Sequence, residues 1–189
     1  PIANDWLHSN SVTYTADGNL IMSIRHQDWV IKINYANGAG DGNVIWRLGK
    51  DGDFSITSSD PYPWFSHQHD AEYELGGNQI LSIYDNGNTR KILFPGANSR
   101  GQVYRIDEVN RRVVHELNAD LGVYCYAVGA AERLLNGNYH FTNGFIGPQG
   151  SPASSRSVEV NPNGSIIFNL ANNRSNYRSF RMRDMYSPH

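Results

Sequence analysis

Three glycine-containing turns recur along the chain about 60 residues apart, and this repeat limits the possible folds more than any other feature. The turns lie in ADGNLIMSIR at 16–25, GGNQILSIYD at 76–85 and NGNYHFTNG at 136–144. A short apolar run precedes each turn and an alternating run follows it, which is the pattern of a β-hairpin with a tight turn. Each turn is therefore predicted to join the first two strands of a repeated unit.

Two further strand-like segments follow each hairpin: WVIKIN and VIWRLG, GQVYRID and VVHELN, and SRSVEV and SIIFNLA. Four strands in each repeat is the signature of a β-propeller blade. We predict one all-β domain over residues 1–189, with blades at approximately 8–50, 67–118 and 126–171 and a closing strand over 177–186. Because propellers close with roughly four to eight blades, we expect another chain or an additional N-terminal segment to complete the ring.

Composition argues against a nucleic-acid partner, a membrane span and an internal disulfide. The chain carries 16 Lys and Arg against 18 Asp and Glu, without a basic stripe, so a nucleic acid is not the expected partner. No apolar run approaches the ~20 residues that span a bilayer, and the first ten residues do not resemble a signal peptide. The single cysteine, Cys125, rules out an internal disulfide and is predicted to be a buried apolar residue.

Polar side chains recur where the predicted blades begin and where their first hairpins end. His8 precedes the first strand and His69 has the corresponding place in the second blade, while Arg25, His26 and Arg90 follow the hairpins. The innermost strands of a propeller surround its central channel. We therefore expect His8 and His69, with Arg25 or His26 and with Arg90, to meet at one mouth of that channel.

Packing and metal binding are the alternatives for these residues. The four tryptophans, Trp6, Trp29, Trp46 and Trp64, are expected to pack between blades rather than to stack on sugars. In the segment SHQHDA, His67 and His69 are expected to share one face of a strand. That arrangement suits zinc or copper if His8 or His26 supplies a third ligand, but the spacing is not diagnostic.

Several motifs together resemble the arylsulfotransferase family, the sulfotransferases that do not use the nucleotide sulfate donor. They are DWLHSNSV, SIRHQDWVIKI, IWRLG, FSHQHDAEY, SIYDNGNTR, SRGQVYRID and NYRSFRMRDMY, and they extend from about residue 5 to residue 187. The resemblance implies a six-bladed β-propeller, of which this chain looks like the C-terminal half. It also implies a periplasmic or secreted location.

The resemblance further implies the transfer of a sulfuryl group from a phenolic sulfate ester to a phenol, through a sulfohistidine, without a metal or nucleotide cofactor. By motif, His69 and Arg90 look like the pair that binds the donor and stabilises charge, and His8 looks like a second, proton-handling histidine. The expected substrate-binding residues in similar segments are Arg25, His26, Asn10 and Arg100. Arginine suits sulfuryl oxygens because its planar donors pair with tetrahedral oxyanions.

The nucleophile is where the chain departs from the family pattern. The corresponding region, NGNYHFTNGFIGPQG, contains one histidine, His140, which lies several residues early and groups with Thr142 by strand alternation. Two hypotheses follow. Either the chain is an enzyme with His140 as its shifted nucleophile, or it is a non-catalytic propeller that has lost this residue and binds an anionic ligand or a partner protein.

Overall fold

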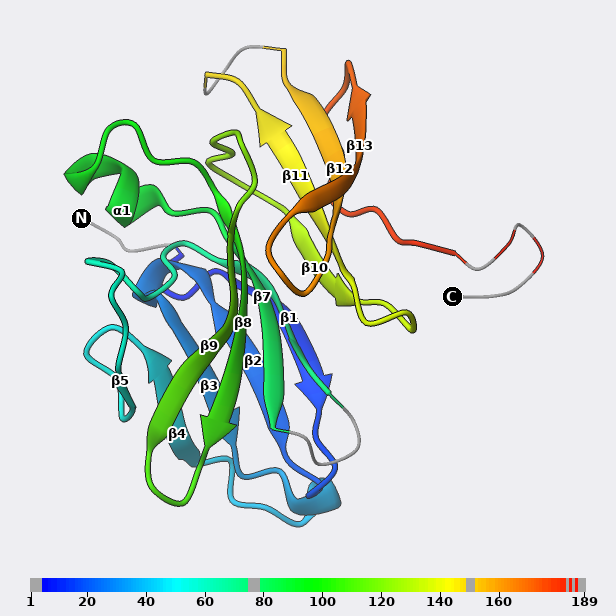
Figure 1. Cartoon of the computed structure of the whole chain (residues 1–189). Coiled ribbons are helices and arrows are strands. Elements are labelled where there is room, and N and C mark those ends of the chain that lie inside the picture. The colour runs from blue at the N-terminus through cyan, green and yellow to red at the C-terminus, as the bar shows by residue number, and fades with distance from the viewer. Residues whose placement is uncertain (1–4, 75–78, 149–151, 183, 185, 187–189) are drawn as a thin grey trace.

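The computed structural model describes residues 5–74, 79–148, 152–182, 184 and 186. Its architecture is three sheets, each containing four successive antiparallel strands, the blades that the sequence predicts (Figure 1). A short additional strand extends the second sheet. Blade one contains β1 (Ser9–Tyr14), β2 (Leu20–Ile24), β3 (Trp29–Ile33) and β4 (Val44–Gly49). Blade two contains β6 (His69–Tyr73), β7 (Ile80–Asp85), β8 (Arg100–Asp107) and β9 (Arg112–Asp120). Blade three contains β10 (Ala130–Arg133), β11 (Tyr139–Ile146), β12 (Ser154–Val160) and β13 (Ile166–Asn172). The all-β prediction is confirmed.

The predicted hairpin turns form in blades one and three for the same physical reason. Gly18 and Gly137 have φ values of 82° and 86°, which glycine adopts without the steric cost that a side chain brings. The amide of Gly18 donates to the Thr15 carbonyl and that of Gly137 to the Leu134 carbonyl, so both turns close alike. The equivalent turn of blade two lies at 75–78, outside the described residues.

Two apolar cores lie between the blades, and β7 contributes to both. Leu81 and Ile83 face the core shared with blade one, whereas Tyr84 faces the core shared with blade three. Phe141 of β11 packs so closely on β8 that a Cβ at Gly101 would collide with its ring. This alternation along β7 makes blade two the centre of the assembly, with the other blades packed on its two faces.

The structure adds elements that the sequence did not predict. The short helix α1 (Asn88–Leu93) follows β7, and the Ser66 hydroxyl accepts the Thr89 and Arg90 amides at its first turn. Six residues are too few to show helical periodicity in a sequence, and the capping group comes from a distant segment. Two 3₁₀ turns, η1 (Arg25–Gln27) and η2 (Ala36–Gly38), flank β3, and β5 (Ser55–Ile56) pairs in parallel with β9.

The closing strand predicted over 177–186 does not form: within the described part of that segment no residue belongs to a strand. A strand needs a ladder of backbone bonds to a neighbour, but here side-chain oxygens take the amide protons. The Ser179 amide donates to Thr142 Oγ1 at 3.1 Å, and the Arg181 amide donates to Glu132 Oε2 at 3.2 Å. The segment therefore lies against blade three without extending any sheet.

Candidate active site

The inner strands of the three blades run side by side and present the ends at which they begin to the same region. β6 packs between β1 and β10. The Thr13 hydroxyl donates to the Ala71 carbonyl at 3.0 Å, and the Asn10 amide donates to the Gln68 carbonyl at 2.8 Å. These bonds fix the two entry loops against each other. The Asn10 side chain was expected to bind substrate. Its polar atoms instead join the two blades, because its Oδ1 also accepts a hydrogen bond from the Asp70 amide.

Five side chains gather where these strands begin, and we call them the histidine site: His8, Arg25, His26, His67 and His69. The His8 and His26 rings stack with centroids 4.8 Å apart, and the centroids of His26 and His67 are 6.1 Å apart. The charges of Arg25 and His8 act on His69. The expected convergence of the first two blades is thus present in the geometry, while the catalytic roles stay predictions.

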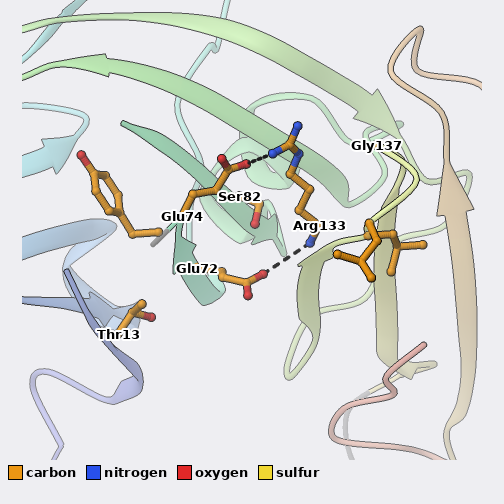
Figure 2. Close-up of a pocket in the computed structure, with 9 residues that line it drawn as sticks. Thr13, Glu72, Glu74, Ser82, Arg133 and Gly137 are labelled. Carbon is orange, nitrogen blue, oxygen red and sulfur yellow. Dashed lines mark hydrogen bonds and ion pairs between the residues drawn. The ribbon is translucent and has the colours of Figure 1, made fainter. Parts of the chain in front are cut away.

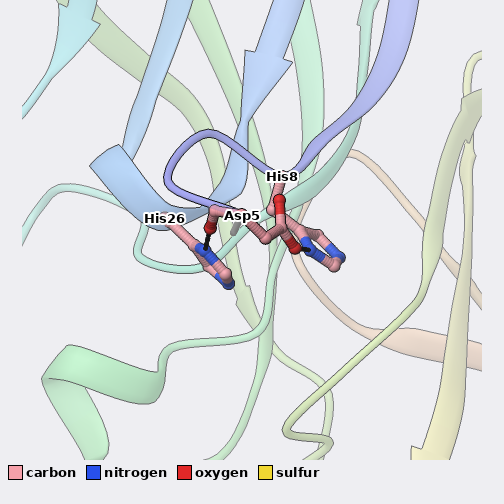
Figure 3. Close-up of side chains that lie close together, drawn as sticks. All are labelled: Asp5, His8 and His26. Atoms are coloured by element: carbon pink, nitrogen blue, oxygen red, sulfur yellow. Dashed lines mark hydrogen bonds and ion pairs between the residues drawn. The ribbon is translucent and has the colours of Figure 1, made fainter. Parts of the chain in front are cut away.

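Asp5 orients both exposed imidazoles (Figure 3). Its carboxylate hydrogen-bonds His8 Nδ1, and its backbone carbonyl accepts from His26 Nδ1 at 2.7 Å. The hydrogen bond from His8 lowers the pKa of the Asp5 carboxyl. Because Nδ1 of each ring faces an oxygen of Asp5, this pattern assigns a proton to Nδ1 in each ring and leaves Nε2 as the nitrogen that does not contact Asp5.

His69 is held as a neutral imidazole in a defined tautomer. Its side chain is 2% exposed, and Nδ1 lies 2.7 Å from Asn86 Oδ1. The Asn86 amide nitrogen donates to the carbonyls of Cys125 and Val128 at 2.8 and 3.0 Å, so the amide oxygen must face His69. Nδ1 therefore carries the proton and Nε2 carries the lone pair. Burial lowers the pKa of His69 to about 4, which keeps the ring neutral at pH 7.

Arg25 supplies the cationic group of the site. It is half-buried at the start of η1, and its Nη2 donates to the Tyr126 carbonyl at 3.0 Å. Burial lowers the pKa of its guanidinium, although nearby Asp28 opposes this effect. Among the described residues no carboxylate lies within ion-pair distance of Arg25, in contrast to the other buried arginines. A half-buried guanidinium without a carboxylate partner is suited to an anionic ligand.

Strained backbone occurs in the same loops, as it does in several turns elsewhere in the described chain. His8, Asp28 and His67 have φ values of 50°, 55° and 53°, in the left-handed region that costs a non-glycine residue about 1–3 kcal/mol at such sites. Asp28 helps to hold this conformation, because its carboxylate accepts the His67 amide at 2.7 Å and the Thr89 hydroxyl at 3.0 Å. Strain that the surrounding structure enforces is typical of functional sites.

The two other predicted arginines form a network inside blade two. Arg100 Nε lies 2.8 Å from Asp85 Oδ2, and its Nη1 lies 2.6 Å from Asp60 Oδ2. Arg90 Nη2 lies 3.5 Å from Asp85 Oδ2 and donates to the Asn98 carbonyl. Both guanidiniums thus anchor the loops around β8 and α1. The expected placement of Arg90 beside His69 is not seen: Asn86, four residues earlier in the chain, contacts His69 instead.

His140 lies in the middle of β11, away from the histidine site. Its Nε2 is 3.0 Å from the Ser179 hydroxyl, which also contacts Thr142 Oγ1 at 2.6 Å. The predicted grouping of His140 with Thr142 on one strand face is therefore confirmed. Burial lowers the pKa of His140, although the charges of Glu132 and Glu159 oppose this effect.

Two contributors were missed from the sequence. Asp5 stands three residues before His8, a spacing that signals a local contact, whereas nothing in the DNGN segment distinguishes Asn86 from an ordinary turn residue.

The residues that could bind a metal differ from those expected from the sequence. In the described parts of the chain, the one group of His, Cys, Asp and Glu side chains with metal-like spacing is Asp5, His8 and His26. His67 instead lies 3.1 Å from Asp28 and His69 contacts Asn86.

A cavity of about 480 Å³ lies toward the opposite ends of the inner strands (Figure 2). Glu72 and Glu74 line it, and Arg133 contacts both: its amide donates to Glu72 Oε2 at 3.4 Å, and its Nη1 lies 2.6 Å from Glu74 Oε1. Two carboxylates and one guanidinium make this wall unfavourable for a sulfate ester. The histidine site is therefore the better candidate for anion chemistry.

The fold and the site define a class of protein. It is an all-β protein built from antiparallel blades, with imidazoles and a guanidinium where its inner strands begin. The chain belongs to the arylsulfotransferase (ASST) family, whose model matches residues 2–181. No curated protein shows significant similarity to the chain. Within the described residues, no helix has the length and apolar character that crossing a membrane requires. The family match confirms the resemblance seen in the motifs and supports a sulfotransferase-like function with aryl sulfate and phenol substrates.

Proposed function

We propose that the protein transfers a sulfuryl group from a phenolic sulfate ester to a phenol, with His69 as the carrier of that group. The observation that carries this proposal is the state of His69: a neutral ring whose Nδ1–H is held by Asn86, close enough to Arg25 for its charge to act on the ring. A sulfuryl-accepting imidazole must be unprotonated at one nitrogen, and Asn86 leaves Nε2 in that form.

In the first half-reaction, His69 Nε2 attacks sulfur, the N–S bond forms and the bond from sulfur to the phenolic oxygen breaks. The electron pair of that bond leaves with the phenolate, whose conjugate acid has a pKa of about 10 and which therefore benefits from a proton donor. His8 is exposed and adjacent, and in its protonated form it supplies that proton. Arg25 stabilises the charge on the sulfuryl oxygens.

In the second half-reaction, the oxygen of the acceptor phenol attacks sulfur, the O–S bond forms and the N–S bond breaks. The electron pair returns to His69 Nε2, and the phenolic proton passes to the neutral His8. His26 stacks on His8 and limits the orientations of its ring. These two steps return the site to its starting protonation state.

His140 is the competing candidate for the carrier. Its Nε2 contacts Ser179, and its Nδ1 is buried without a hydrogen-bond partner among the described residues. The charge of Arg181 acts on His140 as that of Arg25 acts on His69, but Arg181 is exposed and pairs with Glu159 at 3.8 Å. We therefore assign it a structural role that joins β11 to the C-terminal segment. We assign Arg90 and Arg100 to the stabilisation of blade two, and we place the whole protein in a six-bladed ring outside the cytoplasm, as the family suggests.

The test is the intact mass of the protein after brief incubation with 4-nitrophenyl sulfate, followed by peptide mapping at mildly alkaline pH. We expect one added SO₃ group on the peptide that contains His69, and none in His69→Ala. His140→Ala is the matched control and should still form the adduct. An adduct on His140 would transfer the carrier role to that residue. Absence of both adduct and released phenol in a folded sample would favour the anion-binding scaffold.

A further inference from the structure

We propose that Asp5, His8 and His26 form a binding site for one divalent transition-metal ion, with Zn²⁺ as the reference ion. This inference depends only on the geometry of the first loop and η1. An ion bound to His8 excludes the proton transfer assigned to that residue, so the two proposals describe alternative states of the loop. The three residues come from two segments, since His26 follows β2 and the others precede β1.

The ligand set has suitable composition and spacing. One carboxylate oxygen and one ring nitrogen from each histidine all lie within 4.8 Å of one another. Bonds of about 2.0–2.2 Å in a tetrahedral site place ligand atoms roughly 3.3 Å apart, so binding needs a small contraction. The side chains of Asp5 and His8 are 54% and 44% exposed, and so they can rotate without disturbing the core.

The backbone that carries these side chains is already fixed. The Arg25 amide donates to the His8 carbonyl at 3.3 Å, and the His26 amide donates to the Leu7 carbonyl at 3.2 Å. The Gln27 side chain adds a bond to the Trp6 carbonyl at 2.9 Å. These three bonds join the loop to η1, so that little conformational entropy is lost when an ion binds.

The donor atoms select among metals. Two imidazoles and one carboxylate suit zinc, nickel and copper, whereas calcium and magnesium prefer sites made of oxygen alone. His26 Nδ1 already bonds the Asp5 carbonyl, which leaves Nε2 as its metal-binding atom and fixes the ring as such outer contacts do in metal sites. Three protein ligands leave at least one coordination position for water.

The test is calorimetric titration of the whole chain with ZnCl₂ in a buffer without chelating groups. We expect one ion per chain. His8→Ala and His26→Ala should each weaken binding at least tenfold, and Asp5→Asn about tenfold. The matched controls are His67→Ala, from the same end of the molecule, and His115→Gln, from blade two; both should bind as the unmodified protein does.

A second readout uses Co²⁺, whose visible absorption reports nitrogen ligands, and the band should disappear in His8→Ala. Circular dichroism of each variant establishes that the fold is kept. The proposal is overturned if the unmodified protein binds no stoichiometric Zn²⁺, or if the double variant His8→Ala/His26→Ala binds it unchanged. It is also overturned if His67→Ala weakens binding as much as His8→Ala. None of these results depends on sulfuryl transfer, so the two proposals fail separately.

Discussion

His69 and His140 are both buried histidines of this chain, yet their surroundings give them different chemistry. Both pKa values are lowered by burial, so both rings are neutral at pH 7. His69 bonds an amide whose orientation two carbonyls determine, and it lies close to a guanidinium without a carboxylate partner. His140 bonds a hydroxyl and lies near Glu132, Glu159 and Arg181. Because Arg181 pairs with Glu159, the net charge around His140 is negative and disfavours the approach of an anion. We therefore expect the net charge around each buried histidine, rather than its burial, to decide which of them can act on an anion.

The strongest test of this comparison replaces each histidine in turn. His69→Ala should reduce kcat/KM for 4-nitrophenyl sulfate by about 10³-fold or more, because the group that accepts sulfur is lost. His140→Ala should keep activity within about tenfold of the unmodified protein, corrected for the folded fraction. Initial rates of phenol release measure both. Equal losses would remove the distinction between the two residues.

The pH dependence of stability should test the burial of His69. The folded-state pKa of His69 is about 4, below the ordinary value of 6.5, so the unfolded chain binds this proton first as pH falls. Its contribution is therefore complete above about pH 6.5 and is lost as pH falls toward 4, a change of about 3 kcal/mol. Urea unfolding measures the free energy of unfolding at pH 7 and at pH 4.5. The difference between these two free energies should be smaller for His69→Gln than for the unmodified protein. An unchanged difference would mean that His69 titrates normally.

Asn86 sharpens the comparison because His140 has no equivalent partner. Asn86→Ala should lower kcat by about tenfold to a hundredfold, since Nδ1 no longer has an acceptor and the tautomer is free to change. Asn86→Asp keeps the acceptor and adds a negative charge, which raises the pKa of His69 and moves the acid limb of the kcat/KM profile to higher pH. A purely structural role for Asn86 would lower activity in both variants without moving that limb.

Arg25 provides the smallest expected effect. Arg25→Met should raise KM for an aryl sulfate about tenfold, because the cation that faces the anionic donor is lost. Arg105→Met is the matched control: this arginine is exposed, pairs with Glu116 at 2.6 Å and should change KM less than twofold. Steady-state kinetics at constant ionic strength measure both. A similar change in the two variants would indicate a general charge effect instead of a local contact.

Much of the blade architecture could be predicted because its signals are local. Alternation and glycine turns identified all twelve strands of the three blades. The first two blades bring His8, Arg25, His26 and His69 to one region, whereas Arg90, expected with them, approaches Asp85 instead. α1 was missed because Ser66 caps it from another segment. The closing strand was wrong because side-chain oxygens of Thr142 and Glu132 take the amide protons that a ladder needs.

By itself, the sequence determined the order and approximate positions of the twelve blade strands, because strand alternation and turn geometry depend on residues close together in the chain. Only the tertiary structure decided which charged groups are available for chemistry. Arg100 and Arg90 approach Asp85 across blade two, while Arg25 reaches the Tyr126 carbonyl, 101 residues away, and has no carboxylate partner among the described residues. The physical reason is that a buried charge is defined by the partner it meets in space, and such partners leave no pattern in a linear sequence.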